Sequence, residues 1–447
     1  MSDIRYDFLF TFHVPFHVSR MPYDVRGGPM RPNVILIVVD SLRKDYVGCY
    51  GNSDVHTPTI DRLASEGVRF NQHISQASWT APSLGSILTG LNSFEVDMFK
   101  WREDFKTDIL PIFPRLQKAG YRIASYVADC TSQNCISSAN VLGNARDTDS
   151  VFQWLHKNRE SPFFLFLHYW GVHVPYEFKD SAAAWWSGVS ECTDLVRNGK
   201  RDRVIRQYQK AIEALSEEYL PNLLNELQTL NVHENTLLIF TADHGEGWGE
   251  RLKDDSEFTF HDYHQNYLYD EIIQTPLILN WRGYLPKGKV VQSQTRSIDI
   301  VPTILGGLEI PPDTSEDYRP IEGTSLLPLM IRDKDIGPRE AFSATTIGRD
   351  AETIGFKASP KVSLRLPEWK FIWTFKTQEK ELYDLRSDPG EIHNLYAPHS
   401  PIACELEQRI VDKLGFNSTP HLETDFELSE KDRFEIETRL RGLGYIE

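Results

Sequence analysis

Four side chains in this sequence have the types needed to bind a metal ion and to attack an ester. They comprise two carboxylates, one imidazole and one hydroxyl: Asp40, Asp243, His244 and Thr80. This mixed set of oxygen and nitrogen donors suits a divalent cation such as Zn, Mn, Mg or Ca. A bound cation would lower the pKa of the Thr80 hydroxyl and make it a nucleophile near neutral pH. The sequence therefore predicts one metal-centred catalytic site.

The two carboxylates follow apolar runs that are rich in β-branched residues. One run covers residues 34–39 and ends at Asp40, and the other covers residues 237–242 and ends at Asp243 and His244. Both runs are typical of buried parallel strands. Because open α/β sheets bind ligands at the carboxyl ends of their strands, we expect these donors to meet at one edge of a sheet.

Strand and helix patterns alternate along the first part of the chain. Residues 121–127 and 162–168 predict further buried strands. Residues 57–64 predict a helix with Thr at its N-cap and Pro at its first position. Residues 204–230 predict one long helix with a single apolar stripe. This alternation predicts an α/β fold with a mainly parallel sheet flanked by helices.

The last part of the chain has a different pattern. Three short alternating segments, residues 362–366, 369–375 and 381–385, are typical of antiparallel strands and predict a smaller C-terminal sheet. Residues 382–395 are expected to close this sheet rather than to touch the substrate. We divide the chain into an N-terminal arm, a catalytic domain and a C-terminal α+β subdomain, with the boundaries 1–30, 31–335 and 336–447.

Composition limits the partners of this chain. Its 447 residues include 48 Lys and Arg against 64 Asp and Glu, a formal net charge of −16. This charge argues against a nucleic-acid partner. It does not exclude a small anionic ester as substrate, because a bound cation reverses the sign of the potential locally. The sequence leaves homo-oligomerisation open.

The cysteines and the lengths of the apolar runs allow a prediction of the cellular compartment. The five cysteines are odd in number and form no C-x-x-C motif, which argues against a disulfide framework and favours a reducing compartment. The first residues lack the basic start and long apolar stretch of a signal peptide. No run of 18 apolar residues occurs, so we expect no membrane span and a cytoplasmic protein.

Several short motifs, in a fixed order, make the chain similar to a known family. They include residues 48–51, 57–70, 88–90, 243–246, 268–271 and 382–391. From Pro32 to its end, the chain resembles the sulfatase-type family of the alkaline phosphatase superfamily. The resemblance implies an alkaline phosphatase-like sheet and a divalent cation surrounded by the four side chains named above: Asp40, Thr80, Asp243 and His244.

Three departures separate this chain from sulfatases with a formylglycine nucleophile. Where that family has Cys-x-Pro-x-Arg or its Ser form, this chain has Thr80, Pro82 and Leu84. Threonine cannot be oxidised to the formylglycine aldehyde, because its β-carbon carries a methyl group. The second Asp after the first strand is replaced by Ser41, and the Gly-Lys-x-His element is missing from residues 129–134.

With these departures, residues 79–83 resemble the corresponding segment of superfamily members that use a Thr nucleophile. Those members are phosphodiesterases, phosphoethanolamine transferases and lipoteichoic-acid-type glycerophosphate transferases. The resemblance predicts a metal-dependent hydrolase of phosphate mono- or diesters or phosphonate esters, or a phosphoryl transferase, with a phosphothreonine intermediate at Thr80. The alternatives are a sulfuric ester hydrolase, such as a sulfatase or arylsulfatase, and a non-catalytic metal-binding relative. Thr80 could also serve only as a helix N-cap, and Asp243 and His244 only as a strand-end turn.

The resemblance also suggests roles for further histidines. His173 is expected to face the leaving group or a phosphoryl oxygen, whereas His168 is expected to pack or support. His264 is expected to contact the transferred group, because its spacing from the following family motif is better than that of His261. The choice between these two histidines stays open, as does a purely structural role for either. Arg102 is a weaker candidate for a contact to a second anionic group.

Overall fold

The computed structural model describes most of the chain. The described ranges are 31–96, 105–127, 140–176, 182–311, 315–332, 334, 336–337, 339–345 and 360–415. The predicted N-terminal arm, residues 1–30, lies outside them, and so do Arg102 and residues 129–134.

A large sheet forms the centre of the fold. Its eight strands lie in the order β4-β3-β5-β1-β6-β7-β2-β8, and β7 is antiparallel to both of its neighbours while the other pairs are parallel. The prediction of a mainly parallel sheet is therefore confirmed. The strands are β1 Asn33–Val39, β2 Val68–Ile74, β3 Arg122–Val127, β4 Val141–Gly143, β5 Phe163–Tyr169, β6 Thr236–Ala242, β7 Gln274–Asn280 and β8 Lys289–Arg296.

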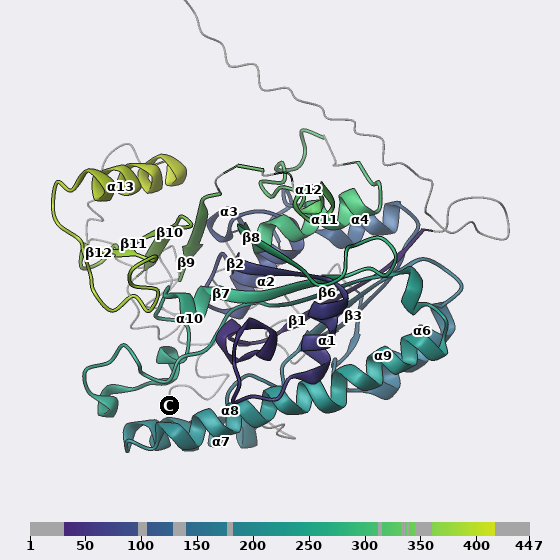
Figure 1. The fold of residues 1–447 in the computed structure, drawn as a ribbon, viewed down its shortest axis with the longest axis horizontal. Coiled ribbons are helices and arrows are strands. Elements are labelled where there is room, and N and C mark those ends of the chain that lie inside the picture. Colours follow the sequence, from purple (N-terminus) through teal and green to yellow (C-terminus); the bar gives the residue numbers. More distant parts are fainter. Residues whose placement is uncertain are drawn as a thin grey trace, which may run out of the picture.

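Helices bury both faces of this sheet. Along β1, Ile35 and Ile37 pack into a core with α1, α8 and α9, whereas Leu36 and Val38 pack into a second core with α2, α4 and α11. Figure 1 shows α1, α8 and α9 on one side of the sheet and α4 and α11 on the other. Burial on both faces explains why β1 is a continuous apolar run. The helices are α1 Pro58–Glu66, α2 Thr80–Thr89, α4 Ile112–Lys118, α7 Ala182–Arg197, α8 Arg201–Ala214, α9 Leu220–Thr229, α10 Asp270–Ile273 and α11 Ile300–Gly307.

The long helix predicted over residues 204–230 contains a local change of pitch. Helices α8 and α9 are joined by a π-helical turn over Leu215–Tyr219. Pro221, near the start of α9, has no backbone N–H and cannot donate to the preceding turn. A π turn is a common way to absorb such an interruption within a helix.

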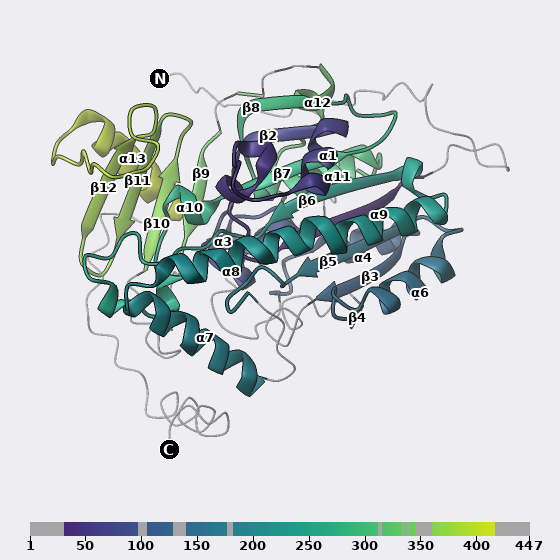
Figure 2. The same cartoon turned by 60° about the horizontal axis from the view of Figure 1, so that its bottom comes forward.

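The small C-terminal sheet is antiparallel, as predicted. Its order is β12-β11-β10-β9, and Phe371 and Trp373 pack with Leu406 and Ile410 of α13. Figures 1 and 2 show this sheet beside α10, at one end of the large sheet. The domain boundaries 31–335 and 336–447 stay predictions. The elements are β9 Ala341–Ala344, β10 Lys361–Arg365, β11 Trp369–Thr374, β12 Glu379–Asp384 and α13 Pro401–Leu414.

The small sheet also touches the segment that precedes α2. Ala77 forms a parallel bridge to Ala344 at the end of β9. The Trp79 indole N–H donates a hydrogen bond to the Thr345 carbonyl at 2.8 Å. These contacts hold the residues immediately before Thr80 in place.

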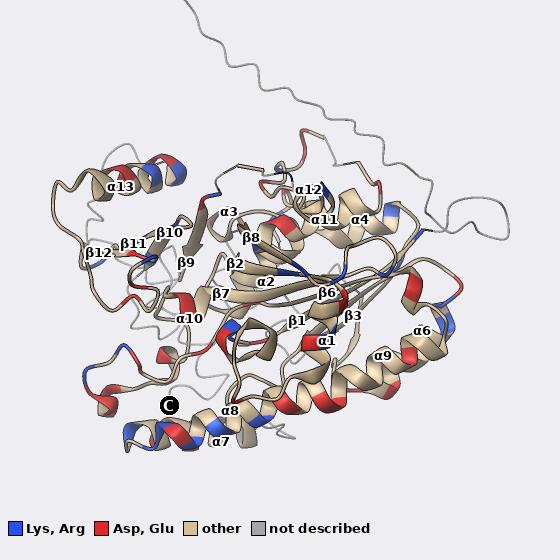
Figure 3. Ribbon diagram, in the orientation of Figure 1, with Lys and Arg blue, Asp and Glu red and all other residues tan. Residues whose placement is uncertain are grey.

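The charged surface follows the outer helices. Within the described ranges, no helix is long and apolar enough to cross a membrane. The start of α8 is basic and its continuation into α9 is acidic, as Figure 3 shows, with Arg201, Arg203, Arg206 and Lys210 followed by Glu213, Glu217, Glu218 and Glu226. This helix therefore presents no continuous basic stripe of the kind that nucleic-acid binding uses.

Candidate active site

Two adjacent strands bring the predicted carboxylates together. Strand β1 lies beside β6, and Val39 pairs with Ala242. Asp40 and Asp243 therefore follow two paired residues at the same edge of the sheet. With His244 they offer three donor atoms that all lie within 4.8 Å of one another, and all three side chains are buried.

Thr80 begins helix α2 beside these donors. Its Oγ1 lies 3.3 Å from Asp40 Oδ2 and 3.3 Å from His244 Nε2. The N-cap of α2 is Trp79, so Thr80 is the first helical residue and not the cap. The unpaired N–H groups and partial positive charge of a helix N-terminus favour an anion at this position.

The buried carboxylates of Asp40 and Asp243 would be stabilised by a nearby positive charge. Asp243 Oδ2 is buried and has no hydrogen-bond partner within the part of the chain that the structure describes. Burial alone would raise the pKa of Asp243, but the neighbouring His244 and His168 lower it instead. A divalent cation would satisfy both the unpartnered oxygen and the paired charges. The residues present therefore fit such a cation.

Close backbone contact positions His244. Its Nδ1–H donates to the Gly245 carbonyl at 2.8 Å, which leaves Nε2 facing Thr80. The Gly245 N–H donates to the Ile272 carbonyl at 2.6 Å. A Cβ at Gly245 would lie 2.0 Å from the Glu271 carbonyl oxygen, so no larger residue permits this approach.

Ser41 supports both carboxylates. Its backbone N–H donates to Asp243 Oδ1 at 3.1 Å, and its hydroxyl donates to Asp40 Oδ1 at 2.9 Å. Ser41 has a φ of 61°, in the left-handed region, and its carbonyl accepts a hydrogen bond from the Tyr208 hydroxyl at 2.8 Å. Ser41 thus orients the two carboxylates instead of adding a third.

Of the two histidines left open by the sequence, His264 lies against the predicted metal donors. Its ring centroid is 4.4 Å from that of His244, and its Nδ1 is 2.9 Å from Glu246 Oε1. His261 is only partly buried, and its Nδ1 lies 2.5 Å from Gln265 Oε1. His264 therefore lies beside the predicted metal donors, and His261 makes a contact within its own segment, while a substrate contact by either stays a prediction.

His173 joins the same group of imidazoles. Its ring centroid lies 5.4 Å from that of His264, and its Nδ1–H donates to the Val174 carbonyl at 2.6 Å. Burial lowers the pKa of His173. Burial, together with the charges of His244 and His173, lowers the pKa of His264 well below its ordinary value. An anionic substrate would oppose both shifts, because negative charge favours the imidazolium form.

His168 reaches the carboxylates, a contact that sequence reasoning missed. Its Nε2 lies 3.5 Å from Asp40 Oδ2 and 3.5 Å from Asp243 Oδ2. Burial alone would lower the pKa of His168, but Asp243 and Asp40 raise it. The sequence predicts only packing or support here, because no motif in it marks which way a strand-end imidazole faces.

Aromatic side chains surround His173. The Trp170 ring stacks on Trp185 of α7, with centroids 5.5 Å apart and planes at 19°. His173 lies 5.1 Å from Trp170 and 5.9 Å from Trp185, between ring centroids. Trp186, also on α7, is 40% exposed and lies 5.5 Å from the Phe260 ring. Flat apolar surface therefore borders the histidines.

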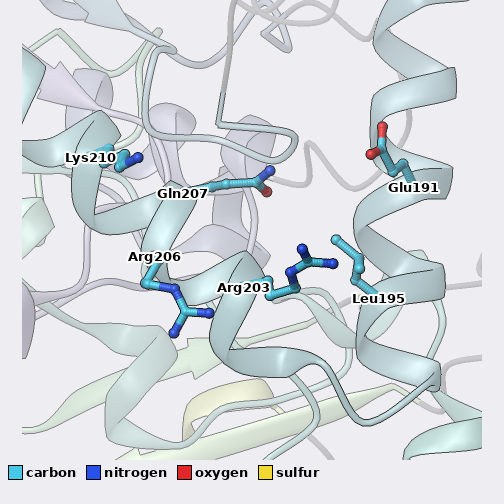
Figure 4. Close-up of a pocket in the computed structure, with 6 residues that line it drawn as sticks. All are labelled: Glu191, Leu195, Arg203, Arg206, Gln207 and Lys210. Carbon is cyan, nitrogen blue, oxygen red and sulfur yellow. The ribbon is translucent and has the colours of Figure 1, made fainter.

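A separate groove of about 340 Å³ lies between α7 and α8 (Figure 4). None of the predicted site residues lines it. Its lining is a mixture of cationic, acidic and apolar side chains: Glu191, Leu195, Arg203, Arg206, Gln207 and Lys210. It lacks the carboxylate and imidazole set described above, and we assign it no role in the reaction.

The fold and the family matches give the class of this protein, a hydrolase family of the alkaline phosphatase superfamily. The Sulfatase family matches residues 32–310, and the family described as N-sulphoglucosamine sulphohydrolase, C-terminal, matches residues 256–415. The chain belongs to the sulfatase family. Enzymes of this family use a divalent metal ion.

Curated relatives carry sulfatase names. An ulvan-active sulfatase of Formosa agariphila is 23% identical over 412 residues, which cover 82% of this chain and 76% of the relative. An N-acetylglucosamine-6-O-sulfatase of Bacteroides thetaiotaomicron is 22% identical over 480 residues, covering 82% of this chain and 83% of the relative.

Solved structures share the fold. One, described as in complex with its substrate D-glucosamine-2-N,6-O-disulfate, has a TM-score of 0.67 and 19% identity, covering 88% of this chain and 100% of the other. The phosphonate monoester hydrolase of Agrobacterium radiobacter has a TM-score of 0.68 and 17% identity, covering 90% of this chain and 99% of the other.

These comparisons contradict the prediction that the substrates are phosphate or phosphonate esters. The relatives with sulfatase names favour the sulfate-ester alternative, whereas the phosphonate hydrolase is a distant neighbour that shows the fold alone. Cleavage of either ester needs in-line attack on a tetrahedral centre and a cation near its non-bridging oxygens. It was therefore wrong to infer from Thr80 which group is transferred.

Proposed function

We propose that this chain is a metal-dependent sulfuric ester hydrolase with the Thr80 hydroxyl as its nucleophile. The observation that carries the proposal is the position of Thr80 Oγ1, 3.3 Å from both Asp40 Oδ2 and His244 Nε2 at the start of α2. Membership of the sulfatase family and the names of the relatives support a small anionic sulfate ester as substrate.

Asp40, Asp243 and His244 would hold the cation, with Thr80 beside it. When bound, the cation lowers the pKa of the hydroxyl and stabilises negative charge on the non-bridging sulfate oxygens. The first-turn N–H groups of α2 add a second stabilising element, because they point toward the position of an anion at the helix N-terminus.

The bond changes start at Thr80. Its Oγ1 attacks the sulfur, so that the Oγ1–S bond forms while the S–O bond to the leaving alcohol breaks. The hydroxyl proton is lost to solvent, because Asp40 and His244, the two groups that lie 3.3 Å from Oγ1, would hold the cation. Water then attacks the sulfothreonine at sulfur, which releases hydrogen sulfate and returns a proton to the threonine oxygen.

His173 or His264 would protonate the leaving oxygen. Both imidazoles have lowered pKa values in the free protein, so the bound anion is needed to favour the charged form. The proton given to the leaving alcohol is replaced from solvent, which received the proton that Thr80 lost. A leaving group that is itself a stable anion needs this proton least.

Sulfated sugars are the substrate class that we propose. Relatives include an N-acetylglucosamine-6-O-sulfatase and a structure with a glucosamine disulfate as its substrate. In this chain, the stacked rings of Trp170 and Trp185 border His173, where the leaving alcohol would lie, and Trp186 packs edge-on against Trp185. Such a surface suits the apolar face of a sugar ring.

A substrate panel tests this function. Purified protein loaded with each of Zn, Mn, Mg and Ca is assayed on glucosamine sulfates, nitrophenyl sulfate, nitrophenyl phosphate and a nitrophenyl phosphonate ester. We expect kcat/KM for the best sulfate to exceed that for every phosphorus ester by about tenfold or more, about 1.4 kcal/mol of barrier. The reverse order would refute the proposal, and inertness toward all esters would favour a metal-binding relative without turnover.

The cellular location and the oligomeric state of this protein stay predictions. Of the cysteines that the structure describes, Cys49, Cys192 and Cys404 form no disulfide. A reducing, cytoplasmic location stays a prediction from the sequence. Homo-oligomerisation is likewise left for a measurement of mass in solution.

A further inference from the structure

His168 is a buried imidazole whose hydrogen bonds are unaccounted for. Its side chain is 1% exposed, and neither ring nitrogen has a hydrogen-bond partner within the described ranges. Leaving a buried polar group unpaired costs about 1–3 kcal/mol. The roles proposed above for the other residues do not use this side chain, so its position calls for a ligand.

The register of three strands explains where His168 faces. In β5, His168 pairs with Val38 of β1, and Val38 pairs with Thr241 of β6. Paired residues of a parallel sheet lie on the same face, and residues two apart along a strand also share a face. His168 therefore shares a face with Asp40 and Asp243, two residues beyond Val38 and Thr241.

That face is the one that α2 covers. Val38 packs in the same core as Leu84 and Ile87 of α2, and Thr80 begins this helix. Three neighbouring strands and one helix therefore each direct a donor toward a common point: His168, Asp40, Asp243 and Thr80.

The distances from each imidazole to the carboxylates match those between ligands of one cation. Donors around a tetrahedral cation with bonds of about 2.0–2.2 Å lie about 3.3–3.6 Å apart. His168 Nε2 lies 3.5 Å from both Asp40 Oδ2 and Asp243 Oδ2. His244 Nε2 lies 3.6 Å from Asp243 Oδ2 and 3.7 Å from Asp40 Oδ1, so the two imidazoles have equivalent spacings to the carboxylates.

We propose that His168 is a direct ligand of the active-site cation, which gives this chain two carboxylate and two imidazole donors. Imidazole suits Zn, Co and other transition metals, whereas Ca and Mg prefer oxygen donors. The second imidazole therefore selects a transition-type cation over Ca or Mg. This inference rests on the metal site of the proposed function and is independent of which ester is cleaved.

Metal affinity tests the inference without turnover. Apparent Kd values for Zn, Co and Ca are measured by chelator competition for the full chain and for His168→Phe. Because loss of even an indirect supporting partner costs about 10- to 100-fold in affinity, we expect Zn and Co to weaken by about 10-fold or more and Ca to change less. The matched control is His233→Phe, another buried histidine with an unpartnered Nδ1, at the opposite end of β6.

A second variant gives direct spectroscopic evidence of ligation. In His168→Cys loaded with Co, a thiolate at this position should produce a sulfur-to-cobalt charge-transfer band that the unsubstituted protein and His233→Cys lack. Unchanged Zn and Co affinity in a folded His168→Phe protein, or absence of the band from a Co-loaded His168→Cys protein, would overturn the inference. Binding of two equivalents in the unsubstituted chain, one of them lost in His168→Phe, would overturn the single shared site.

Discussion

At the scale of single residues, Thr80 is the main difference between this chain and formylglycine sulfatases, because it replaces the Cys or Ser that they oxidise. Its hydroxyl oxygen lies 3.3 Å from each of two proposed cation ligands, Asp40 Oδ2 and His244 Nε2. In the proposed reaction, this hydroxyl attacks the sulfur without oxidative maturation. Its position at the start of α2 also places the developing negative charge where the helix dipole stabilises it.

Removal of the Thr80 hydroxyl should abolish the proposed covalent step. We expect Thr80→Ala to lower kcat by about 1000-fold or more, since loss of a nucleophile has such effects in other covalent enzymes. Thr80→Ser keeps the hydroxyl and serves as the control, with kcat within about tenfold of the unsubstituted protein. Steady-state rates at equal metal content measure this. Near-unchanged turnover by Thr80→Ala would show that another group attacks the sulfur.

Esters with different leaving groups can show whether His173 donates a proton or only binds the substrate. General acids contribute about 10²–10⁴-fold where the leaving oxygen needs a proton. We expect His173→Ala to slow cleavage of a sugar sulfate by about 100-fold or more and of nitrophenyl sulfate by less than about tenfold. The ratio of the two kcat/KM values is the measurement. Equal slowing of both esters would assign His173 to binding rather than to proton transfer.

At the scale of elements, the site lies where α2, β1, β5 and β6 meet, and α7 borders it. Strands of the large sheet supply the buried donors, whereas α7 supplies the exposed Trp186 and the stacked Trp185. The rigid sheet thus holds the reacting centre, and the helix beside it provides surface for the rest of the substrate.

Truncation of Trp186 should weaken substrate binding without slowing chemistry. Aromatic contacts contribute about 0.5–1.5 kcal/mol, which corresponds to about a 2- to 10-fold rise in KM. We expect Trp186→Ala to raise KM for a sugar sulfate by that amount and to leave kcat within about twofold. Leu142→Ala is the control, because Leu142 of β4 is 42% exposed and lies on another element. A fall in kcat with constant KM would place Trp186 in the chemical step.

At the scale of the whole molecule, buried charges join the small sheet to the large one. Lys370 of β11 is fully buried, with Nζ 3.0 Å from Asp270 Oδ1 and 2.8 Å from Glu391 Oε1. Arg365 of β10 also pairs with Asp270, which begins α10, at 2.8 Å. Burial raises the pKa of Glu391 to about 7, with Lys370 opposing the shift. None of these side chains is one of the predicted site residues.

Breaking this cluster should lower stability and spare turnover. Removal of one partner from a buried ion pair costs about 3–5 kcal/mol, because the remaining charge is unpaired. We expect Lys370→Met to lower the free energy of unfolding by about that amount, and Lys370→Met with Glu391→Gln to recover part of it. Urea unfolding measures both. Turnover per folded, metal-loaded molecule should stay within a few fold.

The surface pair Lys380 and Glu407 provides the matched control. Its Nζ to Oε1 distance is 2.7 Å, but both side chains are partly exposed, so Lys380→Met should cost less than about 1 kcal/mol. If Lys370→Met costs no more than Lys380→Met, the buried cluster does not hold the two sheets together.

Acid should destabilise the fold through His73. Burial lowers the pKa of this β2 histidine from its ordinary value of 6.5 to about 3. The unfolded chain therefore takes up a proton below pH about 6.5 that the folded chain refuses until pH about 3, so stability falls with falling pH across this window.

Replacement of His73 by Gln should remove this pH dependence. The unfolding free energy of the unsubstituted protein should fall faster than that of His73→Gln, by up to about 1.4 kcal/mol per pH unit. Urea unfolding between pH 6.5 and the onset of aggregation, with both proteins free of metal, measures the difference. Parallel curves would mean that His73 is protonated in the folded state.

Much of the fold follows from local pattern. The apolar runs before Asp40 and Asp243 became β1 and β6, and the alternating segments of residues 362–385 became the small sheet. Strands β2, β7 and β8 were not predicted, because residues such as Asn71, Gln294 and Thr295 break a simple apolar or alternating pattern. The π turn was not predicted either, because helical spacing continues through it.

The sequence by itself determined which residue types could form the site, because carboxylates at the ends of apolar strands and a hydroxyl at the start of a buried helix can be recognised from local pattern. It placed Asp40, Thr80, Asp243 and His244 near one another in that way. Only the tertiary structure decided that His168 faces the same point. The direction of that side chain depends on the register of β5 against β1, and register is set by pairing between segments far apart in the chain.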